Sequence, residues 1–119
     1  MRMVELSRKG VTKNTLLKVA ELGSMSLKEL AQLLPVTERT IQRYGDEDRF
    51  PRDVSEHVLM LAEVFSKGLE VLGDRETLKD WLRTPIAGLG QPPLDLLDTS
   101  FGVELVKDEL GRLEEGVFS

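Results

Sequence analysis

The sequence contains no cysteine and only one histidine, His57. Without cysteine the chain can form neither disulfides, nor thiolate nucleophiles, nor cysteine-ligated metal sites. A single histidine excludes a His-rich metal site and any mechanism that needs two histidines. No apolar run approaches the roughly 18 residues of a membrane-spanning helix, and the first residues lack the apolar core of a signal peptide. We therefore expect a cytoplasmic protein with no membrane, metal or cofactor attachment.

Charge is present but unevenly distributed. The 119 residues carry a net charge of −5. Residues 1–52 contain ten Lys/Arg and seven Asp/Glu, a net charge of +3. Residues 53–119 contain six Lys/Arg and fourteen Asp/Glu, a net charge of −8. The basic half suits phosphate, and the acidic half, which DNA would repel, suits a protein partner. A soluble domain with an uneven surface charge would show the same numbers.

Apolar spacing and helix caps predict an all-α fold, because no stretch keeps the period of a strand. We expect helices over residues 11–21, 27–34, 38–44, 53–72, 99–115 and from Asp74 through Leu82, with a short helical turn at 94–97. Ser26 with Glu29 forms a capping box, Thr37 and Asp53 are expected N-caps, and Gly23 and Pro35 end helices.

Each expected helix has an apolar side that should face the core, and His57 is expected on the surface. The inward residues are Leu16, Leu17 and Ala20; Leu27, Leu30, Ala31 and Leu34; Val54, Val58, Leu61, Phe65, Leu69 and Leu72; Leu78, Trp81 and Leu82; and Phe101, Leu105, Val106, Leu110 and Leu113.

Residues 27–44 fit a helix-turn-helix. The motif needs a small residue where its helices cross, which is Ala31, and apolar residues after the turn and in the second helix, which are Val36 and Ile41. One position departs from the pattern, because the turn usually has glycine where this chain has Pro35. Proline cannot adopt the left-handed conformation, so the turn must take another geometry.

The outward side of the second helix carries residue types that read base edges and hold phosphates. The candidate DNA-binding residues are Thr37, Glu38, Arg39, Thr40, Gln42 and Arg43, with Arg49 and Arg52 in the following loop. The alternative is an ordinary helix pair in a bundle with a solvated charged face.

The acidic half has a distinctive sequence. It reads Trp81-Leu82-Arg83-Thr84-Pro85, then Leu89-Gly90-Gln91-Pro92-Pro93-Leu94-Asp95-Leu96-Leu97-Asp98-Thr99, then Gly102 and Leu113-Glu114-Glu115-Gly116. This resembles the C-terminal domain of the Xre/MbcA/ParS antitoxins. The preceding helix-turn-helix, including Thr40-Ile41-Gln42-Arg43, and the long helix after it resemble the same family, so the resemblance covers about residues 8–118.

The resemblance implies an antitoxin of a type II toxin–antitoxin pair. It implies a RES-domain toxin as partner, which consumes NAD, together with homodimerisation and repression of the antitoxin's own operon through operator DNA. It also implies that the C-terminal region covers the toxin. The candidate toxin-binding residues are Trp81, Leu89, Pro93, Leu94, Val106, Glu109, Leu110, Leu113, Glu114, Glu115, Gly116, Val117 and Phe118. For Trp81 a core position is the alternative, and for the acidic helix a solvated face.

No set of residues indicates catalysis. Asp46-Glu47-Asp48 lacks the spacing of a calcium loop, Gly88-Leu89-Gly90 lacks the strand and lysine of a phosphate loop, and Asp95 with Asp98 is an isolated carboxylate pair. We expect a DNA-binding region over 1–52, a connecting helix over 53–73 and a toxin-binding and dimerising region over 74–119. The rival functions are a stand-alone transcriptional regulator with a dimerising acidic half, and a structural adaptor without a DNA role.

Overall fold

The computed structural model describes residues 2–118 and the side chains of residues 3–116. The described residues form α1 (Arg2–Lys9), α2 (Lys13–Leu22), α3 (Leu27–Ala31), α4 (Glu38–Arg43), α5 (Arg52–Leu72), α6 (Arg75–Arg83), the 3-10 helix η1 (Pro93–Leu96) and α7 (Ser100–Phe118). They contain no strand, only two isolated bridges, Thr12 with Arg49 and Ile86 with Gln91. The all-α expectation is confirmed. Helix α1 was not expected.

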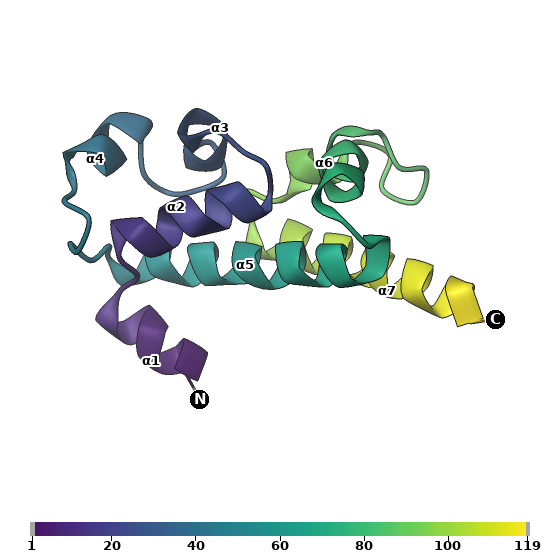
Figure 1. The fold of residues 1–119 in the computed structure, drawn as a ribbon, viewed down its shortest axis with the longest axis horizontal. Coiled ribbons are helices and arrows are strands. Elements are labelled where there is room, and N and C mark those ends of the chain that lie inside the picture. Colours follow the sequence, from purple (N-terminus) through teal and green to yellow (C-terminus); the bar gives the residue numbers. More distant parts are fainter. Residues whose placement is uncertain (1, 119) are drawn as a thin grey trace.

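Helix α5 is the axis of the molecule (Figure 1). Its stripe Val54, Val58, Leu61 and Phe65 is fully buried or nearly so. Helices α1, α2, α6 and α7 all pack against it, so α5 serves both ends of the chain. One continuous apolar core runs from Val11 to Leu110. The stripe predicted for the long helix is therefore the centre of this core.

Helix α5 starts one residue earlier than expected. Pro51 occupies its N-cap position and makes no side-chain cap bond, whereas Asp53 lies in the first turn and accepts a hydrogen bond from the main-chain N–H of Val54. The predicted Asp53 cap is therefore wrong. Proline fixes φ near −65°, and Pro51 has φ −59° and ψ 165°, so its backbone suffices to start the helix without a side-chain acceptor.

Two predicted N-caps are confirmed: Ser26 and Glu29 form the reciprocal capping box, and Thr37 accepts from the N–H of Thr40. Asp74, at the expected start of the next helix, is the N-cap of α6 and accepts from the N–H of Thr77. Helix α3 ends at Ala31, short of the expected Leu34. The N–H groups of Leu33 and Leu34 instead donate to the carbonyls three residues back, which tightens the chain before Pro35. In α2, Val19 rather than Leu17 faces the core, and Leu17 is exposed.

The inner side of α7 also differs from the expectation. Gly102, Val103, Val106 and Leu110 face inward, whereas Phe101, Leu105 and Leu113 are exposed. The reason is the contact with η1, because a Cβ on Gly102 would overlap the carbonyl oxygen of Leu96. The absent side chain at Gly102, rather than the apolar residues beside it, sets which side of α7 meets the core.

Candidate functional site

Helices α3 and α4 pack as a helix-turn-helix requires. Ala31 lies buried at the crossing, and Leu30, Leu34 and Ile41 are buried around it. Val36, just after the turn, packs partly buried against the same core. Among residues 2–118 the only non-glycine residue with a positive φ is Ser24, so the turn at Pro35 contains no left-handed residue. The prediction of an altered turn geometry is confirmed.

The side of α4 that points away from this core carries most of the candidate DNA-binding residues. Arg39, Gln42 and Arg43 are exposed, and Glu38 and Thr40 are half-buried. Thr37 is exposed, but its hydroxyl accepts from the N–H of Thr40 and donates to the Thr40 hydroxyl at 2.9 Å. This cap fixes the first turn of α4, which in this motif is the part that enters the major groove.

The loop after α4 is held against the rest of the basic half. Arg49 and Arg52 are both exposed, and the Arg49 guanidinium donates to the Gly10 carbonyl at 2.7 Å, which braces the loop. The rings of Tyr44 and Phe50 stack with centroids 4.1 Å apart. These contacts hold the loop that follows α4 against the chain at Gly10.

Lys13 is a functional candidate that the sequence analysis missed. Its Nζ donates to the Tyr44 carbonyl at 2.9 Å and to the Gln42 carbonyl at 3.4 Å. A cation at these carbonyls satisfies the C-terminus of α4 and complements its dipole. No local pattern predicts this contact, since Lys13 is 29 residues from Gln42 and 31 residues from Tyr44 in the sequence.

The candidate toxin-binding residues do not share one surface. Val106 and Leu110 are fully buried and Pro93 is buried, so these three belong to the core. The half-buried candidates are Trp81, Leu89, Leu94, Glu109 and Glu114, and the exposed ones are Leu113, Glu115 and Gly116. Val117 and Phe118 lie outside the residues whose side chains are described. The expected non-helical end beyond Glu115 is not found, because α7 continues to Phe118.

Glu109 is fixed by its surroundings. Its Oε1 accepts from Arg112 Nη2 at 2.8 Å, and this hydrogen bond raises the pKa of Arg112. A Cβ on Gly88 would lie 2.5 Å from the same Oε1, so the Ile86–Gln91 turn sits directly on the Glu109 carboxylate. Glu109 thus joins this turn to α7.

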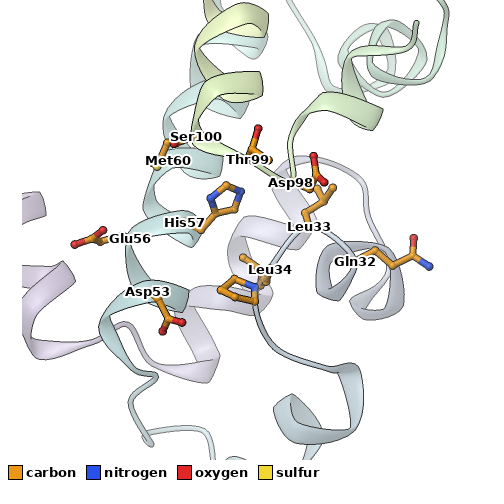
Figure 2. A pocket seen from close by; sticks show the side chains of 11 residues that line it. Gln32, Leu33, Leu34, Asp53, Glu56, His57, Met60, Asp98, Thr99 and Ser100 are labelled. Carbon is orange, nitrogen blue, oxygen red and sulfur yellow. The ribbon is translucent and has the colours of Figure 1, made fainter.

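The junction between the two halves surrounds His57. The expectation that His57 is a surface residue is wrong, because it is buried and its Nε2 lies 2.7 Å from the Leu97 carbonyl oxygen. A carbonyl only accepts, so Nε2 carries the proton. Figure 2 shows the ring pointing from α5 toward the segment of Asp98 and Thr99, beside Leu33 of the turn. A hollow of about 440 Å³ opens here. No group of metal-ligating residues occurs within the described part of the chain.

Two arginines of α6 tie the acidic half to the basic half. Arg75 Nη2 donates to the Glu21 carbonyl at 2.8 Å, and Arg83 Nη2 donates to the Ser24 carbonyl at 3.0 Å. Arg83 also lies 3.4 Å from Glu29 Oε2. The main-chain N–H of Ser26, with Arg83 adding to it, holds the pKa of Glu29 below its usual value.

Comparison with known families covers both halves. The profile of the Antitoxin Xre-like helix-turn-helix domain matches residues 2–63, which is more than half of the chain. The chain belongs to the Xre antitoxin family. The profile of the Antitoxin Xre/MbcA/ParS C-terminal toxin-binding domain matches residues 67–116 of the antitoxin.

Two proteins named Antitoxin Xre are similar to this antitoxin. One, from Yersinia enterocolitica, is 34% identical over 100 residues, which cover 82% of this chain and 68% of that protein. The other, from Photorhabdus laumondii, is 30% identical over 80 residues, which cover 66% of this chain and 54% of that protein.

The family assignment confirms the predicted class of protein. The chain is an antitoxin, not an enzyme, with a helix-turn-helix domain at its start and a toxin-binding domain after it. The helix-turn-helix match extends through most of α5, which agrees with the packing of α2 on that helix. Among residues 2–118 no helix is both long enough and apolar enough to cross a membrane.

Proposed function

We propose that this antitoxin neutralises a NAD-consuming RES-domain toxin in the cytoplasm and represses its own operon by binding operator DNA. The observation that carries the proposal is the presence, on one core, of an exposed α4 side with Arg39, Gln42 and Arg43 and of a domain matched as toxin-binding. Each surface points to one of the two activities.

Charge supports the choice of a RES-domain toxin. An enzyme site that binds an anionic dinucleotide needs a positive potential, so an acidic partner complements it. Residues 53–119 carry the net charge of −8 that this partner needs. We propose that the contact uses the accessible candidates, which include Leu113, Glu115 and Gly116 at the end of α7, and that the core residues Val106 and Leu110 hold the shape of this surface.

Operator binding needs two copies, because one helix-turn-helix reads a half-site. A dimer contact is expected within residues 74–119, but the inner side of α7, like the α5 stripe, is already buried within one chain. We propose instead the side of α1. Its Met3, Val4 and Leu6 are about two-fifths exposed, and a hollow of about 250 Å³ lies between α1 and α5.

The charges around this side fit a second copy of the same chain. Arg8 and Lys9 end α1, and Glu56, Glu63 and Glu70 form an exposed acidic row on α5 at intervals of seven residues. A two-fold contact places the same patch on both partners, so it needs both signs of charge within one patch.

Met3→Glu with Leu6→Glu should give a monomer in sedimentation, with toxin binding unchanged.

Co-expression with the product of the neighbouring gene, which we expect to be a RES-domain protein, tests the proposal. Cells should survive the toxin only when the antitoxin is present, and both proteins should co-purify. The purified antitoxin should shift its own promoter fragment with an affinity that falls steeply with salt. Promoter binding without protection would instead support a stand-alone transcriptional regulator, and protection without promoter binding would remove the repressor role.

A further inference from the structure

Phe101 is the most exposed of the large apolar side chains that the structure describes. It is 76% exposed, whereas the other exposed large apolar side chains lie between 38% and 40%. Leu105, one helical turn along α7, is 38% exposed. Residues four apart lie on the same side of a helix, so the two form one apolar strip at the start of α7.

This strip lies in acidic surroundings. Asp98, Glu104 and Asp108 are exposed next to it along the chain. Two cations are also near: Lys107 Nζ lies 3.6 Å from Glu104, and Arg112 binds Glu109. Residues 95–116 contain seven Asp/Glu and two Lys/Arg, a net of −5, so the surroundings remain negative.

The charge distribution indicates which kind of partner binds to this strip. A second copy bound across a two-fold axis would bring this acidic surface against itself, which costs affinity. Phe101 and Leu105 both lie within the part of the chain matched as toxin-binding. A toxin that presents an apolar cleft with a basic rim meets both the strip and its charges.

We propose that Phe101 and Leu105 anchor the antitoxin in such a cleft of its toxin. This inference rests on the proposed function and names residues outside the end of α7. An aromatic anchor within a polar rim is the usual centre of a protein interface. Here the anchor is preorganised, because the Thr99 hydroxyl accepts from the N–H of Gly102 at 3.0 Å, and Gly102 packs against Leu96. The main chain that carries the anchor therefore has little freedom left to lose on binding.

Alanine variants of the full-length antitoxin test the anchor against a purified RES-domain toxin, the partner that the proposed function names. Phe101→Ala should weaken toxin binding roughly thirty-fold or more, as expected for a central aromatic contact. Phe101→Ala with Leu105→Ala should abolish protection of cells, and Phe101→Leu should restore much of the affinity. Leu17→Ala is the matched control, since Leu17 is as exposed as Leu105 but lies on α2. Asp108→Lys should slow association and reduce its dependence on salt.

Operator binding, sedimentation and thermal unfolding of the same variants complete the test. All three should match the wild type, because Phe101 contributes little to the core. Unchanged toxin affinity in Phe101→Ala overturns the anchor while leaving the proposed function intact. A monomeric Phe101→Ala variant overturns it as well, because the strip would then bind a second copy. Failure of the wild-type antitoxin to bind the toxin refutes the proposed function itself.

Discussion

Arg39 and Arg43 are exposed on α4, whereas the guanidinium of Arg49 already donates to the Gly10 carbonyl. We therefore expect the operator affinity to depend on the first two. Arg39→Ala or Arg43→Ala should weaken operator binding by about 1–3 kcal/mol if the side chain reads a base. Lys79→Ala removes one exposed cation from α6 and should leave the affinity nearly unchanged. Gel shifts at fixed salt measure all three. Equal affinities throughout would remove α4 as the recognition helix.

His57 shows how a single residue can stabilise the junction. Replacing it with alanine leaves the Leu97 carbonyl without its donor and enlarges the adjoining hollow. We expect His57→Ala to lower the free energy of unfolding by about 2–4 kcal/mol, measured by urea denaturation. Ser66→Ala, at an exposed position of the same helix, should change it by less than about 0.5 kcal/mol. A similar small effect for both variants would mean that the hydrogen bond contributes nothing.

The position of His57 also shows a limit of reading one helix by itself. The apolar stripe of α5 could be predicted because its residues recur at steps of three and four. His57 lies beside that stripe, and a polar side chain there is as compatible with solvent as with a buried partner. Its acceptor, the Leu97 carbonyl, is 40 residues away. Only the packing that brings Leu97, between η1 and α7, next to α5 shows that His57 is buried and not exposed to solvent.

Among the helices, α7 depends most on a single glycine. Gly102→Ala would place a Cβ on the Leu96 carbonyl oxygen, which is backbone and cannot move aside cheaply. We expect a loss of about 2–3 kcal/mol in thermal or urea unfolding. Gly111→Ala in the same helix is the control, because the nearest atom to its Cβ is Lys67 Nζ at 4.0 Å. That substitution should stabilise by up to about 1 kcal/mol. Equal effects would show that α7 packs differently.

The cap of α3 gives the protein an acid-sensitive element. The pKa of Glu29 is lowered in the folded state, and the hydrogen bond from the main-chain N–H of Ser26 is the largest cause. A lowered carboxyl pKa stabilises the fold above the unfolded value of about 4.5, and this contribution is lost as the pH falls through the folded value. Glu29→Gln should therefore make stability less dependent on pH below about 4.5. Urea midpoints at pH 3 to 6 should show this, and Glu21→Gln, at an exposed position of α2, should keep the wild-type slope.

Element by element, caps were more predictable than faces. The caps at Ser26 and Thr37 were correctly predicted from local sequence, since a capping side chain bonds within three residues of itself. The inward side of α7 was misassigned because Phe101, Leu105 and Leu113 are apolar and were expected to face the core. The contact of α7 with η1 depends instead on Gly102, which has no side chain. Helix α1 was missed for a related reason: none of its described side chains is buried, so it has no core pattern to read.

At the scale of the whole molecule, the charge boundary near residue 52 does not divide the core. Charged side chains lie mostly on the surface, so the charge distribution can be read directly from the sequence. Burial depends on which faces meet, and α5 meets both α2 and α7. Arg75 and Arg83 add polar contacts from α6 to the Glu21 carbonyl of α2 and to the Ser24 carbonyl just after α2. The two proposed activities can therefore use different surfaces while both halves of the chain are stabilised by the same core.

This shared core leads to a prediction about cooperativity. Leu110 is fully buried on α7, and Leu110→Ala should cost about 2–5 kcal/mol. If the chain unfolds as one unit, slowly exchanging amides of α2 should lose the same free energy of protection as those of α7. Leu113→Ala, on the exposed side of the same helix, should lose far less. Hydrogen exchange of both variants measures this. Unchanged protection of α2 in Leu110→Ala would mean that the helix-turn-helix folds without α7, and that toxin binding could not influence operator binding through the core.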